Sequence, residues 1–362
     1  MTKTFLTRFT GLLACAAALV TPAYAAPANT LETSFDSLFK SRAVEVATPG
    51  KTTSAAPASK APNGRTGVPL IAFVQPKTVY STPFEASIAQ LAESSHGRIG
   101  VAALDLKTGR SLAVLGNQPF PMASTSKVAI VATYLAGVDA GRLRLDQKFP
   151  LMVPVPSRRF EGEAPVRPGA MMPAIDLIEA AITRSDNHAT DALLAAVGGP
   201  AVVTRWVQQT AGIAEFRLDR TIATLVRDDG AVNPATTIDK RDSVTPSAMV
   251  RLLAGIYGGK WLSSDSRLVL MGAMSRTVTG RHRIRAMLPE GTMVAHKTGT
   301  LNNTASDIGF ITSPEGHQVA LAIYVTGQGD KASRDARIAT LARAIYDGYM
   351  SDDMSQRRSA LR

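Results

Sequence analysis

The sequence is poor in cysteine, in aromatic residues and in metal-ligand patterns. Its single cysteine, Cys15, excludes an intramolecular disulfide. Aromatic residues make up 6%, and neither an aromatic-rich nor an arginine-rich nucleic-acid motif occurs, so we expect no nucleic acid as partner. The histidines show no metal-ligand spacing, and we therefore expect no metal and no other cofactor: His96, His188, His282, His296 and His317.

Long apolar runs are also scarce, and the one near the N-terminus has the composition of a targeting segment. Two basic residues precede the apolar residues 11–20, and small residues around Ala25 form a cleavage site. The run is too short to span a bilayer permanently. We expect residues 1–25 to be a signal peptide and the mature protein to be secreted or periplasmic. Lipid attachment at Cys15 is the less favoured alternative, because this cysteine lies inside the apolar run.

Composition divides the rest of the chain. Residues 26–80 are rich in Ala, Pro, Ser, Thr and Lys and predict a flexible linker. Residues 81–350 carry alternating strand and helix patterns and predict one catalytic domain, followed by a polar, basic tail at 351–362. With 45% hydrophobic residues the chain can bury a sizeable core, and its net charge of +11 suits a protein working near anionic envelope polymers.

Three short strings in order carry the chemistry: Ser124-Thr125-Ser126-Lys127, Ser185-Asp186-Asn187 and Lys297-Thr298-Gly299-Thr300. A serine is a poor nucleophile until a base takes its proton, and a lysine three positions later on a helix lies one turn away. The residues after Ser124 are apolar and predict a buried helix, whose N-terminal N–H groups favour negative charge at an attacked carbonyl. An N-capping serine with a surface lysine is the alternative for the first string alone. The ordered trio favours an enzyme that attacks an acyl compound with serine.

S-x-x-K, S-D-N and K-T-G together are the signature of class A β-lactamases and penicillin-binding proteins. The chain resembles class A β-lactamases over residues 83–349, including Arg217-Leu218-Asp219-Arg220 and the Phe120-Pro121-Met122 that precedes the serine. The resemblance implies an α/β fold, in which an antiparallel sheet flanked by helices is joined to an all-helical lobe. The active site would lie between the sheet and this lobe.

The resemblance also implies roles in acyl transfer. Ser124 would be the acylated nucleophile, Lys127 its base, and Ser185 the relay that passes a proton to the leaving nitrogen. The oxyanion hole would be formed by the backbone N–H groups of Ser124 and Thr300. Substrate binding would fall to four further residues by the same resemblance: Asn187 for the side-chain amide, and Lys297, Thr298 and Arg283 for the carboxylate.

One departure from the family pattern concerns the Ω-loop, whose ends the pair Arg220 and Asp242 would pin. Ile222 stands where class A β-lactamases have the glutamate that activates the hydrolytic water, and no glutamate occurs between positions 215 and 290. A substitute base could come from three loop aspartates, although ordinary turn chemistry is the alternative for them: Asp228, Asp229 and Asp239.

Three functions remain open at this stage. The first is a serine β-lactamase-like hydrolase, an antibiotic-resistance enzyme, with slow or unusual deacylation because of Ile222. The second is a D-alanyl-D-alanine carboxypeptidase or penicillin-binding protein acting on peptidoglycan stem peptides. The third is a non-turnover β-lactam or muropeptide binding protein. We expect a monomer with a β-lactam or a stem peptide as its partner.

Periodicity and turn residues predict the elements. Strands are expected at 98–104, 111–115, 293–297, 306–312 and 319–326. Helices are expected at 83–94, 124–140, 173–184, 189–197, 200–211, 246–257, 264–275 and 330–349. His188 directly follows the second string and His296 directly precedes the third, so both could line the cleft wall. A supporting or solvent-facing role is favoured for each, and neither is assigned to catalysis.

Overall fold

The computed structural model describes residues 71–72, 80, 82–94, 96–157 and 162–360. All of them belong to the unit Lys51–Arg362. The expected signal peptide and nearly all of the expected linker lie outside the described residues. The catalytic strings and the whole of the Ω-loop lie inside them.

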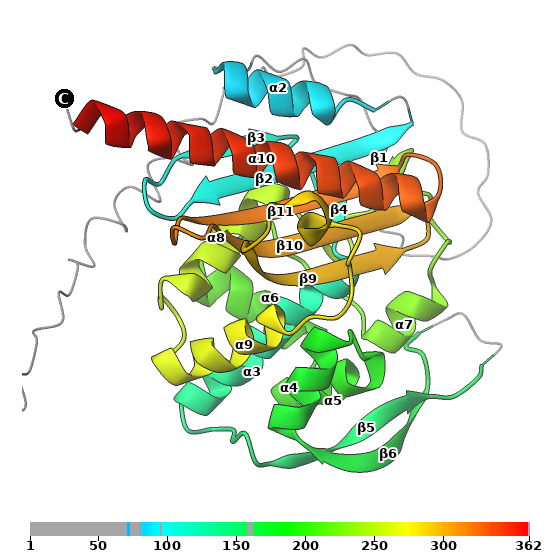
Figure 1. Ribbon diagram of the computed structural model, residues 1–362. Coiled ribbons are helices and arrows are strands. Elements are labelled where there is room, and N and C mark those ends of the chain that lie inside the picture. The colour runs from blue at the N-terminus through cyan, green and yellow to red at the C-terminus, as the bar shows by residue number, and fades with distance from the viewer. Residues whose placement is uncertain (1–70, 73–79, 81, 95, 158–161, 361–362) are drawn as a thin grey trace, which may run out of the picture. The chain divides into compact units, whose positions relative to one another are not determined.

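A five-stranded antiparallel sheet joins distant parts of the chain, in the order β3-β2-β11-β10-β9 (Figure 1). Its strands are β2 (Gly97–Asp105), β3 (Ser111–Val114), β9 (Met293–Leu301), β10 (Thr304–Thr312) and β11 (Gln318–Gly327). Because β2 pairs with β11, the early strands close directly onto the late ones, with Val101 opposite Ile323. This confirms the expected α/β sheet built from both ends of the domain, with helices inserted between its two halves.

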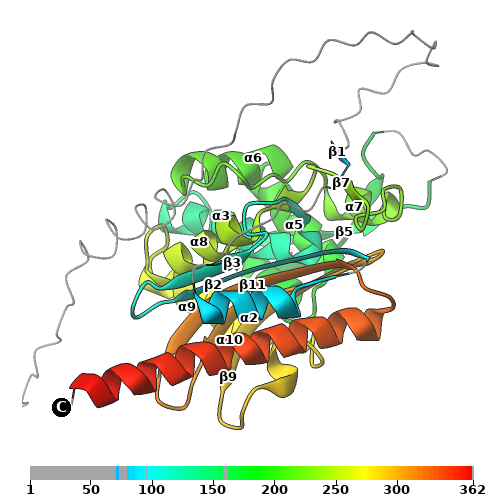
Figure 2. The same ribbon diagram turned by 90° about the horizontal axis from the view of Figure 1, so that it is seen from above.

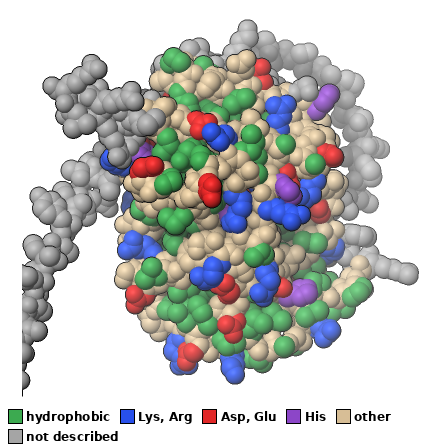
Figure 3. All heavy atoms as spheres, in the orientation of Figure 1, with side chains coloured by type: hydrophobic (Ala, Val, Ile, Leu, Met, Phe, Trp, Pro, Cys, Tyr) green, Lys and Arg blue, Asp and Glu red, His purple; other side chains and the backbone are tan. Residues whose placement is uncertain are grey.

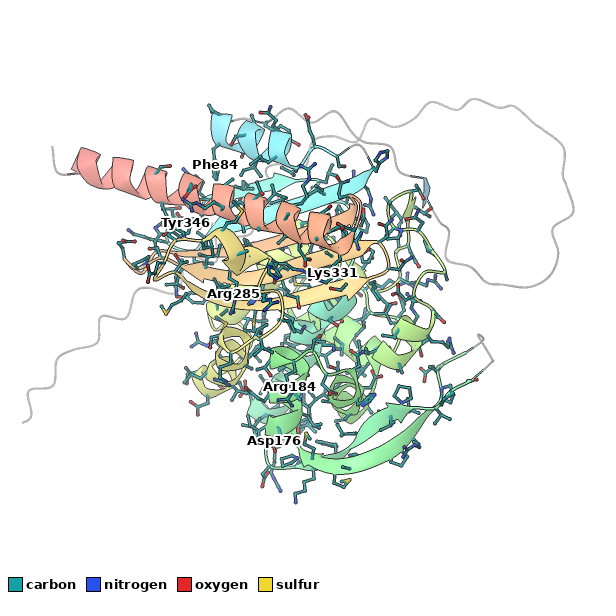
Figure 4. The ribbon with its side chains drawn as sticks, turned by 45° about the vertical axis from the view of Figure 1, so that its right-hand side comes forward. Phe84, Asp176, Arg184, Arg285, Lys331 and Tyr346 are labelled. Carbon is teal, nitrogen blue, oxygen red and sulfur yellow. The ribbon has the colours of Figure 1, made fainter. Side chains whose placement is uncertain are left out.

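Two helices cover one face of this sheet: α2 (Pro83–Leu91) and α10 (Lys331–Ala360) (Figure 2). Phe84 of α2 packs edge-on against Tyr349 of α10, with ring centroids 5.4 Å apart. Figure 4 shows Phe84 and Tyr346 on this same side of the sheet. The expected end of the last helix at residue 349 was wrong, because α10 continues to Ala360 through residues that the sequence pattern assigned to a tail.

The helical lobe covers the other face of the sheet (Figure 2). It contains α3 (Ser126–Asp139), α4 (Ala174–Thr183), α5 (Asn187–Val197), α6 (Pro200–Arg205), α8 (Pro246–Tyr257) and α9 (Ser264–Ser275). α8 packs on β2 and β11, while α3 lies among α4, α5 and α9. Because α3 is surrounded on all sides, its residues from Val128 to Leu135 are almost wholly buried, as the apolar sequence predicted.

Several elements differ from the sequence-based expectation. The hairpin of β5 (Lys148–Pro154) and β6 (Val166–Pro173) was missed, since its prolines argue against a central strand. A two-stranded ribbon has an unpaired edge on each strand, where proline is tolerated. The expected helix at 124–140 is a 3-10 turn, η1 (Ala123–Thr125), followed by α3, and α6 passes into a π-helical turn at Trp206–Thr210.

Two short ribbons, a helix and a 3-10 turn complete the described elements near the site. β4 (Phe120–Pro121) pairs with β8 (Ser243–Val244), and β1 (Ile71–Ala72) pairs with β7 (Thr237–Ile238). A short helix α7 (Ile222–Arg227) lies in the Ω-loop, and a 3-10 turn η3 (Ile284–Met287) precedes β9. The β4–β8 ribbon ties the segment before Ser124 directly to the end of the Ω-loop.

The described surface and helices show no feature that points to a particular partner. On the face drawn in Figure 3, Lys and Arg side chains lie scattered among acidic and apolar ones. Within the described part of the chain, every helix is too short or too polar to cross a membrane. In the same part, no group of three or more His, Cys, Asp and Glu side chains is arranged to hold a metal ion.

Candidate active site

Ser124 lies in a strained turn at the entrance to α3. The preceding Ala123 has φ of +48°, a left-handed conformation that is costly for a residue with a Cβ atom. The hydroxyls of Thr125 and Ser126 close the turn by donating to the carbonyl oxygens of Met122 at 2.7 Å and Ala123 at 2.8 Å. Both of these residues are buried, whereas Ser124 is half-buried. The hydroxyls of Thr125 and Ser126 are therefore hydrogen-bonded within the turn, and Ser124 is the most accessible of the three residues.

Lys127 follows one turn later with its side chain fully buried. Its Nζ donates to the Ser185 carbonyl oxygen at 2.6 Å and to Asn187 Oδ1 at 2.7 Å. Burial lowers the pKa of Lys127 from 10.5 to about 7, against the opposing charges of Asp186 and Asp191. A neutral amine has two N–H groups for the two short bonds and one lone pair left over. Lys127 is therefore equipped to accept a proton near neutral pH.

Ser185 lies between two lysines. Its Oγ is 2.9 Å from Lys297 Nζ and 3.3 Å from Lys127 Nζ, and its backbone has φ of +61°. This left-handed conformation turns both the carbonyl and the hydroxyl oxygen of Ser185 toward Lys127. Because a hydroxyl has two acceptor lone pairs and one donor, accepting from Lys297 leaves its own hydrogen to be donated elsewhere. The arrangement allows Ser185 to pass protons.

Lys297 belongs to β9, the edge strand that packs on the turn Ala123–Thr125 (here called the nucleophile turn). It is fully buried, its Nζ also donates to the Thr298 carbonyl oxygen at 2.8 Å, and burial together with the charge of Lys127 holds its pKa well below the usual range. Gly299 explains how close the strand comes: a Cβ atom there would lie 2.7 Å from the Met122 carbonyl oxygen and 3.0 Å from Ala123 Cβ. Only glycine allows the third string to pack this closely against the two residues before Ser124.

The residues to which the resemblance assigns substrate binding differ in how far their polar groups are already engaged. Asn187 begins α5 and its Oδ1 is taken by Lys127, so its Nδ2 remains as the donor. Thr298 Oγ1 is 2.7 Å from Thr279 Oγ1 and is nearly buried. Thr300, by contrast, is exposed at the strand edge. An amide donor and a hydroxyl thus lie at the open side of the buried lysine pair.

Arg283 lies behind β9 and is only 2% exposed. It donates to Asp335 Oδ1 at 2.6 Å, to the carbonyl oxygens of Gly299 and Ser306 at 2.8 and 2.9 Å, and to Thr300 Oγ1 at 2.7 Å. Four of its five N–H groups are committed by these bonds. The structure therefore places Arg283 where it orients Thr300 and the strand, rather than as an open carboxylate ligand.

The Ω-loop is pinned as the resemblance implied. Arg220 Nε and Asp242 Oδ2 are 2.5 Å apart, and Asp242 Oδ1 accepts the backbone N–H of Asp219 and Arg220. The Asp242 carbonyl oxygen in turn accepts the N–H of Met122, two residues before the serine. Loop end and nucleophile turn are thus one hydrogen-bonded unit.

The three loop aspartates form turn and ion-pair contacts. Asp228 pairs with Arg227 at 2.8 Å, and both carboxylate oxygens of Asp229 accept the backbone N–H of Asn302 at 2.9 Å. Asp239 pairs with Arg241 at 2.7 Å. Each of the three carboxylates is thus engaged by an arginine or by a backbone N–H group.

Ile222 begins α7 and is 2% exposed. Its backbone N–H, like that of Ala223, is bound by the carboxylate of Asp191, at 2.7 and 2.8 Å. Sequence reasoning missed both α7 and Asp191. A signal was present, since Asp191 lies four residues after Asn187 and therefore on the same face of α5.

The two histidines beside the strings differ. His188 is half-buried at the start of α5. His296 is fully buried, and its Nδ1 is 2.8 Å from Asp307 Oδ1 on the neighbouring strand β10. The alternation of β9 turns His296 away from the side chain of Lys297, and its buried contact with Asp307 fits the supporting role that the sequence favoured.

Comparison with known proteins agrees with this geometry. Residues 83–349 match the model of the Beta-lactamase enzyme family. The chain belongs to the class A β-lactamase family. It is 33% identical to Beta-lactamase CTX-M-25 of Escherichia coli over 285 residues, which cover 78% of this chain and 94% of that protein. Beta-lactamase CTX-M-8 of Citrobacter amalonaticus is also 33% identical, over 288 residues and with the same coverage.

Solved structures of the family superimpose on the same part of the chain. A variant of the reconstructed class A β-lactamase of the last common ancestor of Gram-negative bacteria is 36% identical with a TM-score of 0.64. The likeness covers 75% of this chain and all of that one. A β-lactamase from Chitinophaga pinensis is 28% identical with a TM-score of 0.64, over 74% of this chain and all of that one. The expected fold class is thereby confirmed.

Proposed function

We propose that the protein is a serine hydrolase that forms an acyl-enzyme with β-lactams at Ser124. The observation that carries the proposal is the Ser185 hydroxyl held between two buried lysines, one of them a turn after Ser124. Neither lysine is exposed to water, so both depart from ordinary surface chemistry. Membership of the class A β-lactamase family supports a hydrolase that acts on β-lactams.

Acylation follows from these groups. Lys127 Nζ takes the Ser124 proton as Oγ bonds to the lactam carbonyl carbon, and the resulting oxyanion is stabilised by the backbone N–H groups of Ser124 and Thr300. Ser185 then donates its hydrogen to the lactam nitrogen and regains one from Lys127, so the carbon–nitrogen bond breaks and Lys127 returns to its neutral form. The net result is the transfer of one proton from Ser124 to the lactam nitrogen, with Ser185 and Lys127 restored.

Substrate binding uses the open side of the lysine pair. The amine of Lys297 and the hydroxyls of Thr298 and Thr300 can donate hydrogen bonds to a carboxylate, and Arg283 fixes the orientation of Thr300. The Nδ2 of Asn187 is free to donate to the oxygen of a side-chain amide. A bicyclic β-lactam carries both of these acceptor groups.

We further propose that deacylation is slow. Hydrolysis of the Ser124 ester needs a base that takes a proton from water, and the buried Ile222 has none to offer. The nearby Asp228, Asp229 and Asp239 are engaged by arginines or by a backbone N–H group. The acyl-enzyme is therefore expected to persist.

The absence of a base at Ile222 also favours a second candidate, a D-alanyl-D-alanine carboxypeptidase or penicillin-binding protein. Such an enzyme would acylate Ser124 with a peptidoglycan stem peptide and would be trapped by β-lactams. Release of D-alanine from a synthetic stem peptide, measured beside penicillin turnover, separates the two. Under either reading the substrate is met in the cell envelope, which agrees with a secreted or periplasmic protein.

Labelling with a fluorescent penicillin tests acylation. The wild-type protein should take up one label per chain, and Ser124→Ala should take up none. Ser126→Ala is the matched control, because it removes a hydroxyl of the same turn that is already bonded to the Ala123 carbonyl oxygen. Persistent labelling of Ser124→Ala, or no labelling of the wild type, would overturn the proposal.

A further inference from the structure

Asp191 is a buried carboxylate beside the catalytic lysine, and the reaction described above does not use it. It lies on α5, one turn after Asn187, and is only 5% exposed. Its two oxygens accept the backbone N–H groups of Ile222 at 2.7 Å and Ala223 at 2.8 Å. Ile222 has no carboxylate of its own, but the carboxylate of Asp191 binds its backbone N–H.

Two basic side chains and two backbone N–H groups face the carboxylate of Asp191. Lys127 of α3 and His188 of α5 act on it electrostatically, and α7 contributes the two N–H groups. Burial raises the pKa of Asp191, and these N–H groups and Lys127 oppose that rise. Elements β5, α4 and α6 also pack on α5, and among the described residues no ionisable group on them is a source of this shift.

Lys127 feels the same interaction in reverse. Its two opposing charges are those of Asp186 and Asp191, and both raise the pKa that burial lowers. Asp186 uses its side chain to cap α5, where it accepts the N–H of Ala189 at 2.8 Å. Asp186 has the larger effect on the pKa of Lys127, and Asp191 adds to it from a more deeply buried position.

We propose that Asp191 is a positioning residue which supplies from α5 the negative charge that Ile222 lacks. It fixes the first turn of α7 through two backbone bonds, and it stabilises the ammonium form of Lys127 once that lysine has taken the proton of Ser124. The inference rests on the proposed function, since it concerns the lysine that serves Ser124 as base.

Asp191 acts through Lys127 and α7 and not on the substrate. Both oxygens are engaged by N–H groups, and the side chain is almost without solvent contact. A general base for hydrolysis needs an oxygen within hydrogen-bond reach of the attacking water. The structure thus assigns to Asp191 the charge of the missing glutamate without its reactivity.

Asp191→Asn tests the inference, because it keeps the shape and one acceptor oxygen while it removes the charge. Loss of a neighbouring negative charge lowers the pKa of Lys127, so free base persists at lower pH. The acid limb of the acylation rate with a fluorescent penicillin should move down by about one pH unit. Measured at pH 5.5 against each protein's own plateau, the variant should be roughly eightfold faster than the wild type.

Two controls separate charge from packing. Asp191→Glu retains the charge, so its acid limb should stay at the wild-type pH even if its plateau is lower. Asp239→Asn removes a carboxylate that is paired with Arg241, and it should leave the acid limb in place. Asp191→Ser is a second neutral variant if the asparagine protein does not fold.

The outcomes are distinct. An unlabelled wild-type protein would overturn the proposed function itself. A labelled wild type with an acid limb that does not move in the neutral variants, or that moves equally in Asp191→Glu, would overturn the role of Asp191 alone. A uniform loss of rate at every pH would likewise leave Asp191 a purely structural residue.

Discussion

The rate at which a β-lactam acylates Ser124 should depend on pH with a midpoint near neutrality, because Lys127 must be a free amine to take the serine proton. Burial lowers the pKa of Lys127 from 10.5 to about 7. About half of this lysine is then free base at pH 7, against about 0.03% for a lysine with the usual pKa. Burial therefore raises the supply of base roughly a thousandfold.

The acylation rate should fall on the acid side of this midpoint. Each pH unit below the midpoint lowers the free-base fraction tenfold, so acylation at pH 5.5 should be about thirtyfold slower than on the plateau above pH 8. Single-turnover labelling with a fluorescent penicillin from pH 5 to pH 9 measures this profile. An acylation rate that is equal at pH 5.5 and pH 8, or a midpoint above pH 9, would refute the assignment of Lys127 as base.

The same buried lysine leaves a mark on stability. The unfolded chain keeps the Lys127 proton up to about pH 10.5, whereas the folded chain loses it near pH 7, so the unfolded state binds more protons in between and stability rises with pH across that window. Burying the charged form of Lys127 destabilises the folded state by about 5 kcal/mol, and this destabilisation is fully present below pH 7. Lys127→Met has no such group, so relative to this variant the wild type should gain about 3 kcal/mol between pH 7 and pH 9.5. Urea unfolding of both proteins measures the difference, and identical pH dependence would contradict the account.

Two further substitutions test the geometry. Ile222→Glu should speed deacylation by about tenfold or more, at little change in acylation, because a general base contributes about a hundredfold or more when well placed; the decay of labelled protein measures it, and an unchanged decay would count against a missing base. Gly299→Ala places a Cβ atom 2.7 Å from the Met122 carbonyl oxygen, so the nucleophile turn must shift and acylation should fall by about a hundredfold. A near-normal labelling rate in that variant would show that the close approach is dispensable.

Much of the fold was predictable because local signals agreed with the tertiary environment. Helix α8 has the expected bounds, since Thr245 caps it by accepting the N–H of Ala248, Pro246 begins it and glycine follows Tyr257. Most strands of the sheet are apolar and were predicted within one or two residues. β9 continues to Leu301, past the expected end at residue 297, because the polar third string forms part of the strand. The β5–β6 hairpin and α7 were missed, because prolines obscure the first and α7 is only 6 residues long.

The site was predictable to the extent that its residues lie in strings. The three strings name Ser124, Lys127, Ser185 and Lys297, but they do not reveal that Ser185 Oγ lies within hydrogen-bond distance of both lysines. Asp191 escaped notice because its importance depends on what α7 places against it. A carboxylate on a helix face carries no sign of a backbone partner 31 residues away.

The central claim is that Ser124 is acylated readily and released slowly, and intact-protein mass spectrometry after addition of a penicillin measures both steps. We expect the mass of one penicillin to appear on nearly every wild-type molecule within the first time point and to persist over hours. It should be absent in Ser124→Ala. Product release in the same sample should show a burst equal to the enzyme concentration. Rapid steady turnover of the penicillin, with only unmodified protein in the spectrum, would contradict it.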